Sequence, residues 1–65
     1  MYILTITGGI ISAPIICDSL ADAKARMKRT IMLGATTPET MFTIYNVAKG
    51  SYHKYNSMGI CYMEV

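Results

Sequence analysis

The chain changes its hydrophobic period at residues 17–19, and this change constrains the fold more than any other feature. Before it, apolar and β-branched side chains follow the period of two that is typical of strands. After it, apolar side chains recur at spacings of three and four, as along one face of an α-helix. The positions on that helical stripe are Leu20, Ala23, Met27 and Ile31. A strand region is therefore followed by a helix that packs its apolar stripe on a sheet.

Two strands joined by a tight turn are predicted before the helix. The first covers Tyr2–Thr7 and the second covers 10–17. Gly8 and Gly9 between them accept positive φ and predict a two-residue hairpin turn. Pro14 lacks the N–H that a ladder needs, so the second strand is expected at a sheet edge or with a bulge.

The helix is predicted over 19–33. Ser19 is a suitable N-cap, with Asp22 in place of the Glu of a capping box, and Asp18 is the competing cap. Gly34 suits the left-handed residue that follows a last helical turn. Pro38 excludes the helical region for the residue before it and confirms the stop.

The remainder of the chain is predicted to form a strand over 41–49, a turn at Gly50 and Ser51, and a last strand over 59–65. The stretch 52–58 fits either a loop or the beginning of that strand, and a twisted hairpin with a break at 57–59 is favoured. The order is β-β-α-β-β. Residues 1–65 are thus predicted to form one α+β domain, with a four-stranded, mainly antiparallel sheet and one helix on one face.

Both faces of this sheet are predicted to be apolar. Of the 65 residues, 52% are hydrophobic and only 15% charged, against about 25% charged in average chains. A bare apolar face is an aggregation hazard, so a homodimer or larger closed assembly is expected. The alternative is a monomer with scattered exposed apolar residues and a core filled by flexible Met side chains. The expected interface residues are Ile3, Tyr45 and Val47 on the sheet and Met32 and Leu33 at the helix end.

Cysteine usage, charge and hydropathy limit the compartment and the partners. Cys17 and Cys61 are too few for a disulfide framework and fit no zinc spacing, so both are expected to be reduced in a cytoplasm. No signal peptide or membrane span is indicated, since a span needs about 18–20 apolar residues. The net charge of +2 selects neither nucleic acid nor an acidic protein.

Catalysis is not expected, and no cofactor or metal site is predicted. Cys17, just before a helix N-terminus, and the single histidine, His53, are the one conceivable nucleophilic pair. A small buried side chain at a strand end is the favoured interpretation of Cys17. The chain carries no metal-ligand spacing and no phosphate-binding glycine motif. No catalytic residue is therefore predicted.

Candidate binding residues lie in the most aromatic stretch and on the helix. The stretch combines stacking rings with hydrogen-bond donors, which suits a protein interface or a stacked base; a solvated hairpin is the alternative. On the helix, one flank carries two lysines that two copies of the chain could bring together on an anion. The candidate residues are Tyr52, His53, Lys54, Tyr55 and Asn56 in the stretch, and Lys24 and Lys28 on the helix.

Three runs define the layout of the chain. They are Tyr2-Ile3-Leu4, Pro14-Ile15-Ile16-Cys17-Asp18-Ser19-Leu20-Ala21-Asp22-Ala23-Lys24 and Phe42-Thr43-Ile44-Tyr45-Asn46-Val47. This layout resembles that of short phage-encoded β-β-α-β-β accessory proteins, some of which block a bacterial defence protein or sequester its nucleotide messenger. The resemblance implies a non-enzymatic, oligomeric binder made in the cytoplasm of a bacterial host, and it carries over no functional residue.

The expected function is therefore inhibition of a bacterial defence protein by direct binding. The expected partners are a second copy of the chain and a host protein, with no membrane contact. One alternative is a sponge that sequesters a nucleotide immune signal between subunits. A small nucleic-acid-binding protein and a structural role in the virion are further alternatives.

Overall fold

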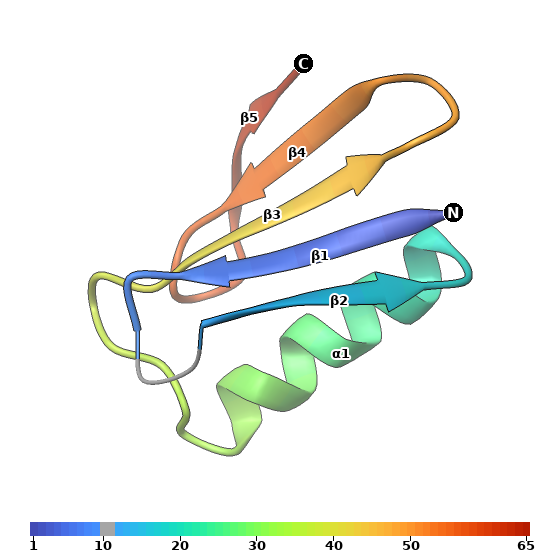
Figure 1. Cartoon of the computed structure of the whole chain (residues 1–65). Coiled ribbons are helices and arrows are strands. Elements are labelled where there is room, and N and C mark those ends of the chain that lie inside the picture. Colours follow the sequence, from blue (N-terminus) through green and yellow to red (C-terminus); the bar gives the residue numbers. More distant parts are fainter. Residues whose placement is uncertain (10–11) are drawn as a thin grey trace.

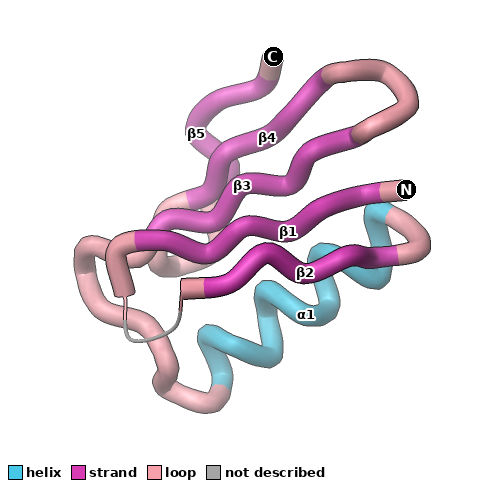
Figure 2. Tube along the Cα trace, in the orientation of Figure 1, coloured by secondary structure: helices cyan, strands magenta, loops and turns pink. Residues whose placement is uncertain are grey.

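The computed structural model describes residues 1–9 and 12–65. Within them, five strands form one antiparallel sheet in the order β2-β1-β3-β4-β5, with a helix on one face (Figures 1 and 2). The elements are β1 (Tyr2–Thr7), β2 (Ala13–Cys17), α1 (Leu20–Met32), β3 (Met41–Asn46), β4 (Ser51–Tyr55) and β5 (Cys61–Glu64). The α+β class and the helix are as predicted, but the sheet has five strands instead of four.

The third strand ends earlier than predicted, and the additional strand β4 follows it. β3 stops at Asn46 instead of residue 49, since the Asn46 carbonyl accepts from the Gly50 N–H (2.8 Å) and its side chain accepts from the Lys49 N–H (3.4 Å). β4 then begins directly at Ser51. The part of 52–58 that the sequence left open between loop and strand is thus a strand as far as Tyr55.

The predicted break at 57–59 is confirmed as the turn between β4 and β5. Asn56 organises it, because its side-chain oxygen accepts from the N–H groups of Met58 (2.9 Å) and Ile60 (3.0 Å). The pairing then shifts by one residue, with Met63 opposite Lys54 and Cys61 opposite Tyr55. The extra residue makes a β-bulge in β5.

The predicted two-residue turn at Gly8 and Gly9 is wrong. Ile6 pairs with Ala13, which leaves a longer connection between the strands, and Ile10 and Ile11 of the predicted second strand lie outside the described residues. Gly8 has φ +72°, and a Cβ there would meet the Glu39 carbonyl. The two glycines therefore serve a close approach to the α1–β3 connection, not a tight turn.

The edge position of the second strand, predicted from Pro14, is confirmed by the strand order. The helix is also capped as predicted. Ser19 is the N-cap and accepts from the Asp22 N–H (3.1 Å), so the competing cap at Asp18 is not used. Gly34 follows the last turn with φ +72°.

The core lies between α1 and the sheet face that we call the inner face. The helix contacts β1, β2 and β3, whereas β4 and β5 extend beyond it (Figure 1). Of the predicted helical stripe, Ala23 and Met27 are buried and Leu20 and Ile31 pack against them. The buried apolar residues are Leu4, Ile6, Cys17, Ala23, Met27, Phe42, Ile44 and Tyr55. Within the described ranges, no helix has the length and hydropathy to cross a bilayer.

Candidate protein-binding surfaces

The sheet face opposite α1, which we call the outer face, carries a row of apolar and aromatic side chains. The register places Ile16 beside Ile3, Ile3 beside Tyr45, and Tyr45 beside Tyr52. Two backbone hydrogen bonds, of 3.0 and 2.9 Å, extend this row from Tyr52 to Val65. Because paired residues of an antiparallel ladder share a face, the row crosses β2, β1, β3 and β4 and ends at Val65, the residue after β5.

This row continues at one end of β1 and β3. The Val47 N–H donates to the Met1 carbonyl (3.2 Å), which sets these two exposed side chains beside Ile3 and Tyr45. We call the combined surface the outer patch. It consists of Met1, Ile3, Ile16, Tyr45, Val47, Tyr52 and Val65. Contiguous exposed apolar surface of this kind marks an interaction site in soluble proteins.

The predicted interface residues lie on two separate surfaces. Ile3, Tyr45 and Val47 belong to the outer patch. Met32 and Leu33 are 85% and 73% exposed, but they lie at the C-terminal end of α1, on the other side of the sheet. The structure therefore does not bring the two groups together within one chain.

Strand alternation divides the predicted binding stretch between the two faces. Tyr52 and Lys54 lie on the outer face, with the Lys54 Nζ 5.7 Å from the centroid of the Tyr52 ring. His53 and Tyr55 lie on the inner face, where Tyr55 is only 5% exposed and belongs to the core. Asn56 is occupied in the β4–β5 turn. Of these five residues, Tyr52 and Lys54 therefore remain as candidates for binding a partner on the outer face.

His53 and Tyr55 make a local pair on β4. The Tyr55 hydroxyl lies 3.5 Å from the His53 Nδ1, and the two rings meet edge to face at 6.4 Å. Burial raises the pKa of the Tyr55 phenol, and the nearby Cys61 and Glu64 raise it further. The phenol therefore stays protonated at neutral pH, which fits a packing role.

The conceivable nucleophilic pair is not assembled. Cys17 on β2 and His53 on β4 are separated by β1 and β3, or roughly 14 Å at about 4.8 Å per strand. Burial, with the negative charge of Asp22, raises the pKa of the Cys17 thiol. Both cysteines are free. In the part of the chain that the structure describes, no three metal-ligating side chains gather closely enough to hold a metal ion.

Thiol labelling is expected to separate the two cysteines. Cys61 is exposed and Cys17 is buried with a raised pKa, so a thiol reagent at pH 8 should modify Cys61 at least about tenfold faster, because the reacting form is the accessible thiolate. Mass spectrometry of the digested protein measures both rates. The variant Cys61→Ser is the control, since it should leave only the slow reaction. Fast labelling of Cys17 would instead point to an activated thiol.

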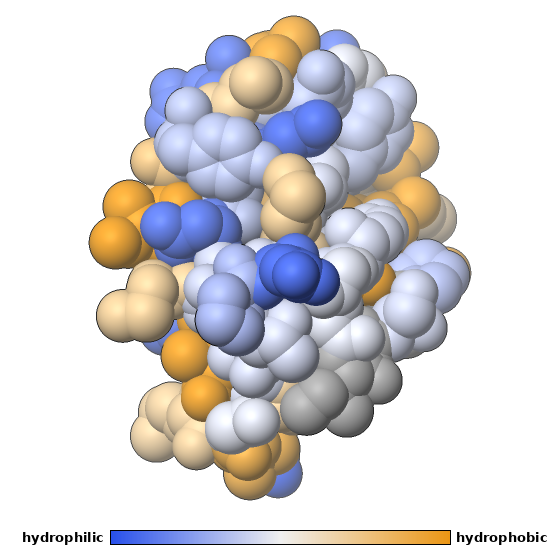
Figure 3. Space-filling view, turned by 90° about the vertical axis from the view of Figure 1, so that its left-hand side faces the viewer, coloured by the Kyte–Doolittle hydropathy of each residue, from blue (hydrophilic) through white to orange (hydrophobic). Residues whose placement is uncertain are grey.

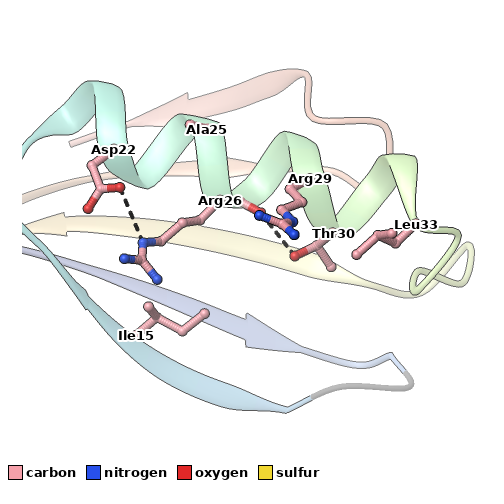
Figure 4. Close-up of a pocket in the computed structure, with 7 residues that line it drawn as sticks. All are labelled: Ile15, Asp22, Ala25, Arg26, Arg29, Thr30 and Leu33. Atoms are coloured by element: carbon pink, nitrogen blue, oxygen red, sulfur yellow. Dashed lines mark hydrogen bonds and ion pairs between the residues drawn. The ribbon is translucent and has the colours of Figure 1, made fainter.

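A groove of volume ≈ 520 Å³ runs between α1 and the edge strand β2. Figure 4 shows Arg26 extending from the helix toward β2, above Ile15. The Arg26 Nε lies 3.2 Å from the Asp22 Oδ1, and the Thr30 hydroxyl donates to the Arg26 carbonyl (3.0 Å). The lining residues are Ile15, Asp22, Ala25, Arg26, Arg29, Thr30 and Leu33.

The predicted helix lysines do not line this groove. Lys24 and Lys28 are exposed on another flank of α1, whereas Arg26 and Arg29 line the groove. These two arginines were assigned no role from the sequence. One feature of the sequence could have pointed to them. Both arginines lie on the helix flank that adjoins β2, and Pro14 marks β2 as an edge strand.

A smaller hollow, of volume ≈ 230 Å³, opens beside the first turn of α1, where the helix leaves β4 uncovered. Of the predicted binding residues, Tyr52 and His53 line it. The Asn46 amide donates to the Tyr2 hydroxyl at its base (3.4 Å). The hollow is a shallow gap beside the core and gathers no group of charges.

The end of the molecule that carries the β1–β2, α1–β3 and β4–β5 connections has a different character from the outer patch. Figure 3 shows its hydrophobic surface as separate patches divided by polar side chains.

Comparison with protein-family models, with curated proteins and with solved structures finds no match.

Proposed function

We propose that this chain is a non-enzymatic binding protein that forms a homodimer through the outer patch. The observation that carries the proposal is the unbroken row of apolar and aromatic side chains across β2, β1, β3 and β4 to Val65, the residue after β5. A stable interface buries about 800 Å² per partner. This area is about a fifth of the 4221 Å² that one chain exposes, and a second copy supplies a surface of the same apolar character.

A two-fold arrangement suits this surface. In an isologous dimer the same patch meets itself, and two sheets pack face to face about 10 Å apart. Tyr45 and Tyr52 lie in the middle of the row and supply the large aromatic contacts that dominate interface energies. Lys54 lies beside the row, where it can keep its ammonium group in solvent.

The proposed target of the dimer is a bacterial defence protein, inhibited by direct binding in the host cytoplasm. The layout resemblance to phage accessory proteins suggests this class. The distribution of cations also favours protein binding over the sponge and the nucleic-acid binder. Lys54 lies on the outer face, while Lys24 and Lys28 lie on the helix across the sheet, so one chain gathers no basic surface from them.

Light scattering coupled to size exclusion tests the self-association. We expect a mass of twice 7.2 kDa at micromolar concentration, and 7.2 kDa at all concentrations would contradict the proposal. For the target, we expect a co-eluting complex with at least one member of a panel of purified bacterial defence proteins. A nucleotide that raises the melting temperature, with no complex formed, would instead support the sponge.

A further inference from the structure

We propose that the groove between α1 and β2 binds an extended, acidic segment of a partner protein, which adds to the edge of the sheet as a sixth strand. The inference concerns a surface on the helix side of the molecule. It therefore does not depend on dimerisation through the outer patch.

The hydrogen-bond phase of the sheet shows which groups of β2 are free. The Val47 N–H donates to the Met1 carbonyl, so the odd-numbered residues of β1 direct their main-chain groups toward β3 and the even-numbered ones toward β2. These even-numbered residues pair with the odd-numbered residues of β2. Pro14 and Ile16 therefore direct their main-chain groups away from β1, toward the free edge.

This edge offers three main-chain groups, which are the Pro14 carbonyl and the N–H and carbonyl of Ile16. No backbone partner for them lies within the described residues, and Ile16 is 68% exposed. Strand addition uses such groups for affinity and neighbouring pockets for specificity. The missing Pro14 N–H removes one donor from this edge but leaves these three groups for an added strand.

The groove lies directly beside this edge and can receive every second side chain of an added strand. Ile15 lines it from β2, and Ala25 and Leu33 line it from α1 and the residue after it. The opposite edge is less suitable, because β5 carries a bulge that interrupts regular pairing. An edge strand and an adjoining groove thus coincide only at β2 among the described strands.

The charge of the groove selects acidic side chains. Arg26 and Arg29 both line it, and Asp22 is the one carboxylate among the lining residues. Asp22 pairs with Arg26 and also accepts from the Asp18 N–H at the helix start (3.3 Å). One positive charge therefore remains uncompensated. An arginine guanidinium binds a carboxylate through two parallel hydrogen bonds, which favours Glu or Asp over a neutral residue.

Fluorescence anisotropy with a labelled octapeptide of alternating Glu and Val tests the proposal. We expect saturable binding, weakened about tenfold or more by Arg29→Glu, since a charge-assisted contact becomes a repulsion. Lys28→Glu makes the same charge change on an exposed helix position outside the groove and should alter the affinity less than about twofold. Circular dichroism of both variants verifies that the helix is retained.

Three further outcomes decide the binding mode. Of the two peptides that carry N-methyl groups at one or the other set of alternate residues, one should lose binding, because only one set of N–H groups faces the Pro14 and Ile16 carbonyls. Unchanged binding of both peptides would overturn strand addition. Equal binding of a Lys–Val peptide would overturn the charge argument, and stronger binding of a single-stranded oligonucleotide would assign the groove to nucleic acid. Measurement on a monomeric outer-patch variant separates this result from the dimer, since the groove should bind equally well there.

Discussion

Replacement of Phe42 by alanine is expected to lower the free energy of unfolding by about 3–5 kcal/mol, because truncation of a buried aromatic ring loses its burial and leaves a cavity. Phe42 is 0% exposed and lies on the inner face in the central strand β3. A chain of this size has a total stability of about 3–10 kcal/mol. The variant should therefore be partly or fully unfolded at room temperature.

Urea denaturation followed by circular dichroism measures this effect at one fixed protein concentration. Met32→Ala is the matched control, since it also truncates a large apolar side chain but one that is 85% exposed, and it should change stability by less than about 0.5 kcal/mol. A loss for Phe42→Ala no larger than that of the control would show that the core is not centred on the inner face of β3.

The helical stripe through Ala23 and Met27 could be predicted from the sequence, because a period of 3.6 residues determines it. Strand alternation groups Phe42 and Ile44 on one sheet face, but both faces are apolar in sequence, so only the structure shows which face meets the helix. The number of strands could not be predicted in the same way. It depends on the turn between β4 and β5, which the side-chain hydrogen bonds of Asn56 organise, and no hydrophobic pattern encodes such bonds.

The binding residues could likewise be predicted only in part from the sequence. The sequence identified an aromatic stretch at 52–56, but it did not decide between loop and strand, and only a strand sends Tyr52 and Tyr55 to opposite faces. The outer-patch residues Ile3, Tyr45 and Val47 were found because alternation alone places them. Arg26 and Arg29 were assigned no role, since their importance comes from the adjacent edge strand and not from their spacing.

Replacement of Tyr45 by lysine is expected to convert the dimer into a monomer. Tyr45 lies in the middle of the outer patch on β3, and a two-fold interface contains every substitution twice. Two buried, like-charged ammonium groups in place of two aromatic anchors should raise the dissociation constant at least about 100-fold, which corresponds to ~2.7 kcal/mol. Sedimentation velocity over a concentration series measures the shift.

Met32→Lys distinguishes the two surfaces on which the predicted interface residues lie. It introduces the same charge at the end of α1, across the sheet from the outer patch, so the dissociation constant should stay within about twofold of the unsubstituted chain. The reverse pattern, a dimer that survives Tyr45→Lys and dissociates with Met32→Lys, would move the interface to the helix end. Because Tyr45 is excluded from the core, the folded fraction should be retained in both variants, and dissociation can then be attributed to the interface itself.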